Sequence, residues 1–241
     1  MSAVPAEQRP GARERVYGLQ RVYVWELPVR LAHWLLFLSI LVLAGTGYYI
    51  GNPFISVPGP ARAHFVMASM RTVHLYASIV FTLSVLARLY WAFAGNRYAR
   101  WSDLIPASLE RLRSFKQSVL FYTFLSREPV HYLGHNGLAG FTYAVIFGVY
   151  FVMIATGFAL YTVYASVGSP MQVFGFLIPI FGGLQMARVI HHIGMWAILV
   201  FAVAHVYFVV LYSLVEHIGI FDSIFSGFKF TAEKHNARSR D

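Results

Sequence analysis

The apolar run over residues 188–207 constrains this chain more than any other stretch, because it is long enough to cross a bilayer and carries histidines within it. His191 and His205 are 205 − 191 = 14 positions apart. At about 100° per residue, this spacing falls roughly 40° short of four turns, so both imidazoles leave one helix face, about 21 Å apart along the axis. His192 lies roughly 220° around the helix from His205 and points elsewhere. One face of one predicted helix thus offers a histidine at each of two membrane depths, as two stacked metal centres would need.

The composition indicates a membrane protein in which histidine is the available metal ligand. Of the 241 residues, 58% are hydrophobic and only 12% are charged, whereas about a quarter of a soluble domain is charged. The net charge of +9 would suggest nucleic acid in a soluble chain, but here the basic residues lie between apolar segments and indicate membrane topology, so no nucleic-acid partner is expected. The absence of cysteine excludes disulfides, cysteine-ligated iron–sulfur clusters and covalent c-type haem, which leaves histidine to bind iron.

Four long apolar segments predict an all-α integral membrane protein, a four-transmembrane-helix bundle that forms a single membrane domain over residues 1–241. The spans are expected at about residues 31–50, 73–93, 139–161 and 189–215. Residues 1–24 are expected to form a mobile basic arm that lacks the apolar core of a cleavable signal peptide. Residues 216–241 are expected to form a basic tail.

Two shorter segments are expected to lie at the membrane surface without crossing it. Residues 108–124 combine spaced apolar positions with basic ones, a pattern typical of a surface helix. Residues 171–181 are apolar, but about 11 residues are too few to span the hydrocarbon core, so this segment is expected to pack at the interface.

The distribution of Lys and Arg predicts the side of the membrane on which each loop lies. Five lie in the N-terminal region through Arg30, six between the second and third spans, and four in the tail, which makes 15, against three in the other two loops. Loops on the cytoplasmic side carry the excess of positive charge. Both termini are therefore expected in the cytoplasm.

Depth in the membrane pairs the histidines of different spans. With the N-terminus inside, His33 begins the first span near the cytoplasmic surface, and His74 begins the second near the external surface. The predicted pairs are therefore His74 with His191 and His33 with His205, each suited to hold a haem b between two imidazoles in a helical bundle. A single intramembrane histidine could equally hydrogen-bond a neighbouring carbonyl, but four histidines in two depth-matched pairs favour haem.

Two further spacings support this arrangement. Gly47 follows His33 by 47 − 33 = 14 positions, where a missing side chain would admit a macrocycle at the external level. Arg88 follows His74 by 88 − 74 = 14 positions, where a guanidinium could meet a haem propionate at the cytoplasmic level. Three more arginines could bind propionates, although topology and headgroup contact explain them equally well: Arg30, Arg71 and Arg188.

The predicted ligand set points to electron transfer. With both axial positions filled by imidazole, a haem iron has no open site for oxygen or substrate. Two haems stacked across the membrane would conduct single electrons between its faces, and electrons delivered one at a time could reduce a quinone.

Four stretches carry a resemblance to a known family: residues 30–47, 132–139, 153–161 and 188–205. They resemble the cytochrome b subunit of membrane-bound nickel–iron uptake hydrogenases, and the Gly-His-Asn stretch at residues 134–136 is the most discriminating. The resemblance implies haem ligands at the same four histidines. It also implies a bacterial inner-membrane location and a periplasmic hydrogenase, whose large subunit is joined to a small iron–sulfur subunit with a membrane-anchoring helix. The chain would then transfer electrons without activating hydrogen by itself.

The position of the quinone site is a hypothesis. The cytoplasmic end near His33 and His205 also contains His135 and Asn136, which could contact a quinone. Equally, His135 and Asn136 could form the N-terminal cap that leads into the third span.

Three other functions remain open at this stage. The chain could serve another extracytoplasmic enzyme, such as formate dehydrogenase, with the same two haems. It could be a free-standing quinol oxidoreductase of the b561 type. It could also be a small transporter in which intramembrane histidines relay protons.

Overall fold

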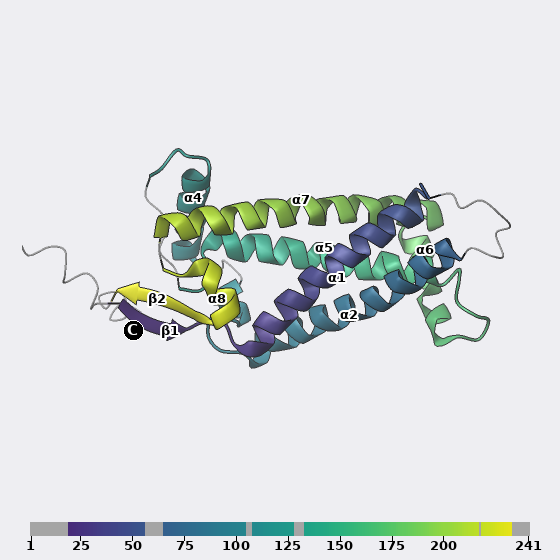
Figure 1. Cartoon of the computed structure of the whole chain (residues 1–241), viewed down its shortest axis with the longest axis horizontal. Coiled ribbons are helices and arrows are strands. Elements are labelled where there is room, and N and C mark those ends of the chain that lie inside the picture. Colours follow the sequence, from purple (N-terminus) through teal and green to yellow (C-terminus); the bar gives the residue numbers. More distant parts are fainter. Residues whose placement is uncertain (1–18, 56–64, 105–107, 128–132, 217, 233–241) are drawn as a thin grey trace, which may run out of the picture.

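Four long helices form the body of the computed structural model, which describes residues 19–55, 65–104, 108–127, 133–216 and 218–232. They run along the long axis of the molecule (Figure 1) as α1 (Leu27–Gly51), α2 (Val66–Ala94), α5 (Gly137–Tyr161) and α7 (Leu184–Glu216). Each is long and apolar enough to cross a membrane, so the predicted set of four spanning helices is confirmed. Every helix begins a few residues earlier than the sequence predicted.

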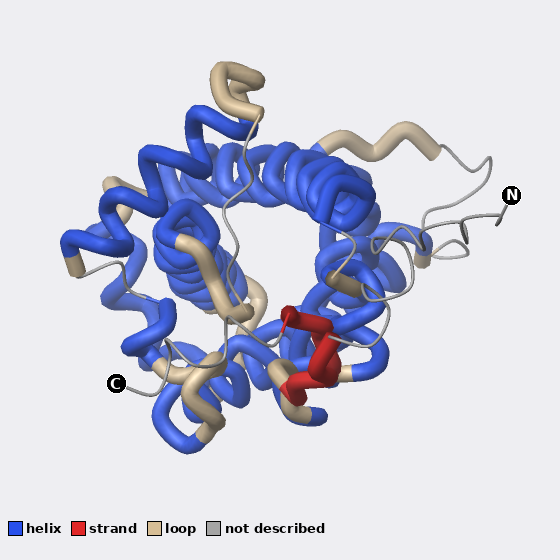
Figure 2. Tube along the Cα trace, turned by 90° about the vertical axis from the view of Figure 1, so that its left-hand side faces the viewer, coloured by secondary structure: helices blue, strands red, loops and turns tan. Residues whose placement is uncertain are grey.

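The core lies across the middle of the bundle, which Figure 2 shows from one end. α1 packs against α2 and α5 packs against α7. All four helices contribute to one buried cluster: Leu36, Phe81, Val85, Ile146, Phe147, Tyr150 and Ile198. Ile198 stands midway between His191 and His205 on α7, seven residues from each (198 − 191 = 205 − 198 = 7). The large apolar side chains therefore fill the layer that separates the two histidine levels.

Short helices occupy both ends of the bundle (Figure 1). α4 (Leu109–Tyr122) confirms the helix predicted over residues 108–124, and Ser108 caps it by accepting a hydrogen bond from the backbone N–H of Arg111 at 3.3 Å. At the opposite end, η2 (Pro170–Phe176) and α6 (Leu177–Ile180) form the short apolar segment between α5 and α7. α3 (Trp101–Leu104) and α8 (Ile220–Ser226) complete the described helices.

A two-stranded antiparallel sheet is the only β-sheet among the described residues. β1 (Leu19–Tyr23) pairs with β2 (Phe228–Ala232), and Tyr23 is opposite Phe228. The sequence assigned these segments to a mobile arm over residues 1–24 and to a basic tail over residues 216–241, but residues 19–23 form a strand and the tail forms α8 and β2. Residues 1–18, 217 and 233–241 lie outside the described residues. The pairing brings the ends of the described chain together beside α8 (Figure 1).

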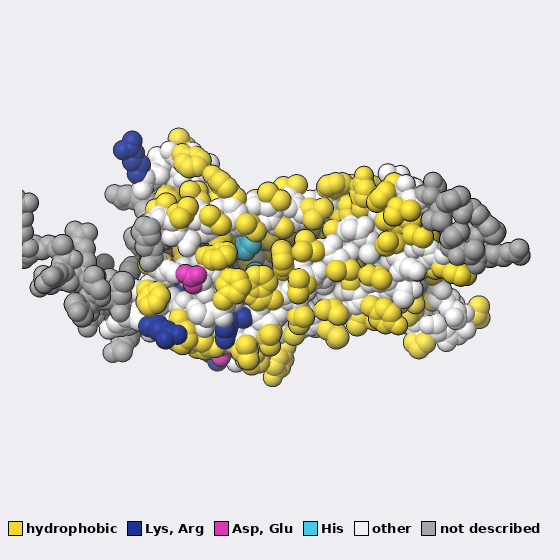
Figure 3. Space-filling model, viewed as in Figure 1, with side chains coloured by type: hydrophobic (Ala, Val, Ile, Leu, Met, Phe, Trp, Pro, Cys, Tyr) yellow, Lys and Arg dark blue, Asp and Glu magenta, His cyan; other side chains and the backbone are white. Residues whose placement is uncertain are grey.

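A partly buried carboxylate network ties the connection between β1 and α1 to the end of α2. Glu26 Oε2 accepts hydrogen bonds from Trp91 Nε1 and from the backbone N–H of Asn96, both at 2.8 Å. The Asn96 side-chain amide in turn donates to the carbonyl of Val24 at 3.0 Å. Charged side chains visible in Figure 3 gather at this end of the molecule, whereas the middle is mostly apolar. This end of the bundle is therefore polar, and side-chain hydrogen bonds hold its segments together.

Candidate functional site

The structure brings the four predicted histidines together as two pairs, each of which includes α7. The ring centroids of His33 on α1 and His205 on α7 lie 6.3 Å apart, with 52° between the ring planes. Those of His74 on α2 and His191 on α7 lie 6.5 Å apart, with 57° between the planes. These are the pairs that depth in the membrane predicted. We name them the inner pair (His33, His205) and the outer pair (His74, His191).

Both separations fit one metal ion held between two imidazoles. A metal–imidazole bond of about 2.0–2.1 Å, with the ring centre roughly 1.1 Å beyond the nitrogen, places two opposed ring centres about 6.2–6.4 Å apart. The observed separation of 6.3 Å lies inside this range, and that of 6.5 Å lies just above it. Within the described part of the chain, no group of three or more His, Cys, Asp or Glu side chains converges on one point. A metal held by either pair of histidines would take its other ligands from elsewhere, and the porphyrin of haem supplies four such ligands.

Threonine hydroxyls engage Nδ1 of both histidines of the outer pair. Thr46 Oγ1 lies 2.8 Å from Nδ1 of His74, and Thr156 Oγ1 lies 2.8 Å from Nδ1 of His191. With Nδ1 engaged, Nε2 is the nitrogen left to bind a metal. The sequence assigned no role to either threonine, because a threonine in an apolar helix is as often a packing residue as a hydrogen-bonding partner of a functional side chain.

The inner pair is held by aromatic neighbours. The His33 ring meets Trp34 edge-on at 5.3 Å, and the His205 ring is stacked on Phe201 at 5.5 Å. His33 Nδ1 is buried and has no hydrogen-bond partner in the described part of the chain. His33 therefore differs from both histidines of the outer pair in the surroundings of its Nδ1.

Gly47 lies where the sequence placed it, at the level of the outer pair. A Cβ atom on Gly47 would stand 3.2 Å from Cε1 of His74, closer than ordinary van der Waals contact. The glycine therefore makes room for the histidine ring itself. His192 points away from both pairs, as predicted: its Nδ1 lies 2.8 Å from the carbonyl of Arg188, and its ring abuts Gly51.

Arg88 is buried near the inner level and is bonded to protein. Its guanidinium donates to the Ala99 carbonyl at 3.2 and 3.3 Å and lies 5.1 Å from the ring centre of Tyr143. Only 4% of Arg88 is exposed, so the charge is well removed from solvent. A contact between Arg88 and a haem propionate stays a prediction.

The other three arginines also have protein partners. Arg30 donates to the carbonyl of Phe225, while its buried Nε has no partner among the described residues. The Arg71 guanidinium lies 4.6 Å from the ring centre of Tyr164. Arg188 is hydrogen-bonded to Gln185 at 3.2 Å. Their role toward propionates stays a prediction.

The predicted quinone-site residues have different surroundings. Asn136 caps α5, because its side-chain oxygen accepts a hydrogen bond from Ala139 N at 2.8 Å. The His135 ring instead packs between aromatic rings, 5.0 Å from Trp25 and 5.8 Å from Tyr143. The capping alternative thus holds for the Asn136 side chain, while the His135 side chain takes part in an aromatic cluster.

Tyr143 is a polar residue of this region that the sequence did not single out. Its ring is stacked on Phe147 at 4.4 Å, and its hydroxyl is buried without a hydrogen-bond partner among the described residues. Both His135 and Arg88 are neighbours of its ring. A tyrosine in an apolar span resembles any other aromatic packing residue, so sequence alone gave no signal.

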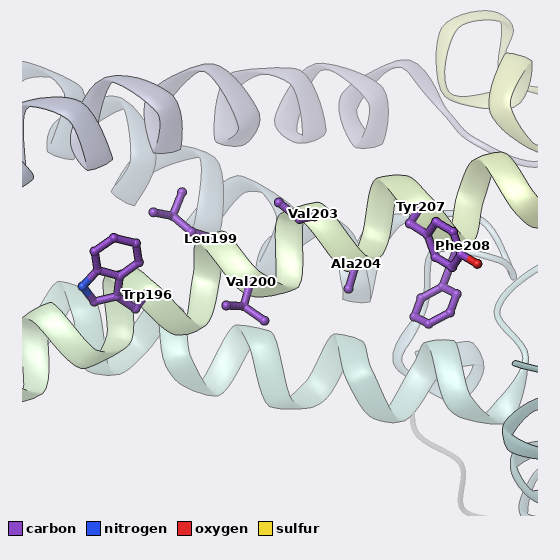
Figure 4. A pocket seen from close by; sticks show the side chains of 7 residues that line it. All are labelled: Trp196, Leu199, Val200, Val203, Ala204, Tyr207 and Phe208. Carbon is purple, nitrogen blue, oxygen red and sulfur yellow. The ribbon is translucent and has the colours of Figure 1, made fainter. Parts of the chain in front are cut away.

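An apolar hollow runs along α7 but contains none of the four histidines (Figure 4). It is lined by Trp196, Leu199, Val200, Val203, Ala204, Tyr207 and Phe208. The histidine pairs, and not this hollow, therefore define the site.

Known proteins similar to this chain match it over nearly its whole length. The family model described as prokaryotic cytochrome b561 matches residues 24–227. A probable Ni/Fe-hydrogenase B-type cytochrome subunit from Cupriavidus necator is 40% identical over 218 residues, which cover 88% of each chain. The corresponding protein of Rhizobium leguminosarum bv. viciae is 41% identical over 217 residues, 89% of this chain and 91% of the relative. A probable Ni/Fe-hydrogenase 1 B-type cytochrome subunit of Escherichia coli is 36% identical over 220 residues, which cover 86% of this chain and 90% of the relative. The chain belongs to the family of Ni/Fe-hydrogenase B-type cytochrome subunits.

Proposed function

We propose that this chain is the di-haem b electron-transfer subunit of a membrane-bound nickel–iron hydrogenase, and that it passes electrons from the partner's iron–sulfur cluster to membrane quinone. The observation that carries the proposal is the presence of two histidine pairs, each with the ring separation that one axially bound metal requires. The relatives' names supply the partner enzyme and the cytochrome type. The chain itself would not activate hydrogen.

Each pair would bind one haem b through Nε2 of its two imidazoles. The haem supplies reversible one-electron chemistry, and two imidazole ligands leave its iron without a site for oxygen or substrate. His191 and His205 carry both sites on one continuous helix, α7, about 21 Å apart along its axis. The apolar cluster that contains Ile198 lies between the two levels.

The polar end of the bundle would face the cytoplasm. The N-terminal region, the α2–α5 connection and the tail hold 15 of the 19 Lys and Arg residues, and positive loops stay inside. The outer pair would then lie toward the periplasm, where it can receive electrons from the small subunit. Both termini would lie in the cytoplasm of a bacterium, with the chain in its inner membrane.

The quinone would be reduced beside the inner pair, at the cluster of His135 and Tyr143. A quinone needs protons as well as electrons, and the cluster offers the His135 imidazole together with the buried Tyr143 hydroxyl. The Tyr143 hydroxyl has no hydrogen-bond partner among the described residues. Arg88 adds a fixed positive charge next to Tyr143, which would stabilise a reduced, anionic ring oxygen.

A reduced-minus-oxidised absorption spectrum of the purified chain, with a haem-to-protein ratio, tests the proposal. Two haems b per chain are expected. A ratio of one would require that one histidine pair be dropped. A preparation without a haem Soret band would overturn the proposal in favour of the proton-relaying transporter. Purification with hydrogenase subunits would distinguish the proposed partner from formate dehydrogenase and from a free-standing oxidoreductase.

A further inference from the structure

The outer pair is flanked by two matched Thr-Gly dipeptides on different helices. Thr46 and Gly47 are consecutive on α1 and face His74 of α2; Thr156 and Gly157 are consecutive on α5 and face His191 of α7. In each case the threonine Oγ1 lies 2.8 Å from Nδ1 of the histidine. A Cβ atom on the following glycine would lie beside Cε1 of the same ring, at 3.2 Å for Gly47 and 3.5 Å for Gly157.

The threonine contacts favour the tautomer in which Nδ1 of each outer histidine carries the proton. Thr46 Oγ1 lies 2.7 Å from the carbonyl oxygen of Val42, and Thr156 Oγ1 lies 2.7 Å from that of Val152. A carbonyl oxygen can only accept, so each hydroxyl hydrogen is donated to the backbone. The hydroxyl oxygen can then only accept from the histidine. Nδ1 must carry the hydrogen, which leaves the Nε2 lone pair for the metal.

Burial protects these bonds from competition by water. Thr156 is 0% exposed and Thr46 is 8% exposed. In the inner pair, by contrast, His33 Nδ1 is buried without a hydrogen bond in the described part of the chain. An acceptor on Nδ1–H raises the basicity of Nε2, and a more basic axial ligand favours the oxidised form of the iron.

We propose that Thr46 and Thr156 are positioning residues that orient the outer histidines, fix their tautomer and lower the reduction potential of the outer haem. The inference rests on the proposed function, because it requires a haem at His74 and His191. Gly47 completes the arrangement at His74, since a Cβ atom there would crowd the ring at 3.2 Å, whereas a Cβ atom on Gly157 would be in ordinary van der Waals contact with His191 at 3.5 Å. A lower potential on the outer side favours electron flow inward, from the partner enzyme to the inner pair.

The test is a spectroelectrochemical titration of the purified hydrogenase–cytochrome complex carrying Thr46→Val or Thr156→Val. Valine retains the branched shape and removes the acceptor. Each variant should raise the midpoint potential of one haem transition, the one that is missing in His191→Ala. The double variant should raise it further, and the Thr→Ser variants should restore the wild-type value. The low-spin ferric resonance of the same haem should shift in the valine variants only.

Ser39→Ala is the matched control. Ser39 is a buried hydroxyl on α1 that donates to the carbonyl of Leu36 at 2.9 Å, so its removal should leave both potentials unchanged. Unchanged potentials in both valine variants would overturn the inference, as would an equal shift of both haems or serine variants that behave like valine. A wild-type complex without a haem in this chain would instead contradict the proposed function.

Discussion

His191 and His192 are adjacent on α7, yet they serve different parts of the molecule. The His191 ring faces His74 across the bundle, with 6.5 Å between centroids. His192 is bonded through Nδ1 to the carbonyl of Arg188 in the preceding turn and packs against Gly51, at the end of α1. One step of about 100° along α7 therefore separates a ring that faces its partner histidine from a ring that packs against the end of α1.

This difference gives the first prediction. His191→Ala should remove the outer haem and reduce the haem-to-protein ratio from two to one, because one imidazole cannot replace two axial ligands. His192→Ala should retain both haems. The measurement is the pyridine haemochrome content of the two purified variants. Equal haem contents in the two variants would contradict the pairing.

Two glycines on α1 provide the second prediction. A Cβ on Gly47 would stand 3.2 Å from His74 Cε1, whereas a Cβ on Gly45 would meet nothing within 4 Å. Gly47→Ala should displace the His74 ring and accelerate haem loss after dilution in detergent. Gly45→Ala should leave haem retention unchanged and favour the helix by roughly 0.5–1 kcal/mol. Identical haem-loss rates in the two variants would show that a side chain at position 47 does not displace the His74 ring.

The Glu26 network gives a prediction that does not depend on haem. Glu26→Ala removes the acceptor of two 2.8 Å hydrogen bonds, from Trp91 Nε1 and Asn96 N. Because hydrogen bonds to charged groups contribute about 1.5–3 kcal/mol each, the variant should melt at a clearly lower temperature. Glu26→Gln keeps a neutral oxygen acceptor and should lose less. Thermal melting in detergent is the measurement, and equal melting of Glu26→Ala and wild type would refute it.

The sequence carried enough information for the histidine pairs, for a physical reason. Successive spans cross the membrane in opposite directions, so a residue's place within its span gives its depth. The 14-residue interval on α7 then fixes one face. Depth and face together were sufficient to pair His33 with His205 and His74 with His191, as the ring distances now show.

The sequence did not carry the contacts that depend on how helices rotate against one another. Thr46 reaches His74 because of the packing of α1 on α2, which hydrophobic periodicity does not specify. The β1–β2 pairing joins two five-residue segments from opposite ends of the chain, too short and too distant for a local pattern to link. Arg88 meets the Ala99 carbonyl through the turn after α2, a contact set by local backbone geometry.

Orientation in the membrane is the fourth prediction. A fluorescent protein fused to the C-terminus should be fluorescent, and a periplasmic phosphatase fused there should be inactive, because the Lys- and Arg-rich loops keep the tail inside. A phosphatase inserted in the loop between α1 and α2 should be active. The reverse pattern at both positions would invert the assignment of inner and outer pairs.

The last prediction concerns His135, whose ring lies 5.8 Å from that of Tyr143. His135→Ala should slow quinone reduction and leave the haem spectrum intact, because its ring packs against Trp25 and Tyr143, which belong to neither histidine pair. Asn136→Ala is the neighbouring control: it removes a helix cap that contributes about 1 kcal/mol, and should lower thermal stability more than turnover. Hydrogen-dependent quinone reduction, measured with melting temperature, separates the two. A normal rate in His135→Ala would exclude its side chain from the quinone site.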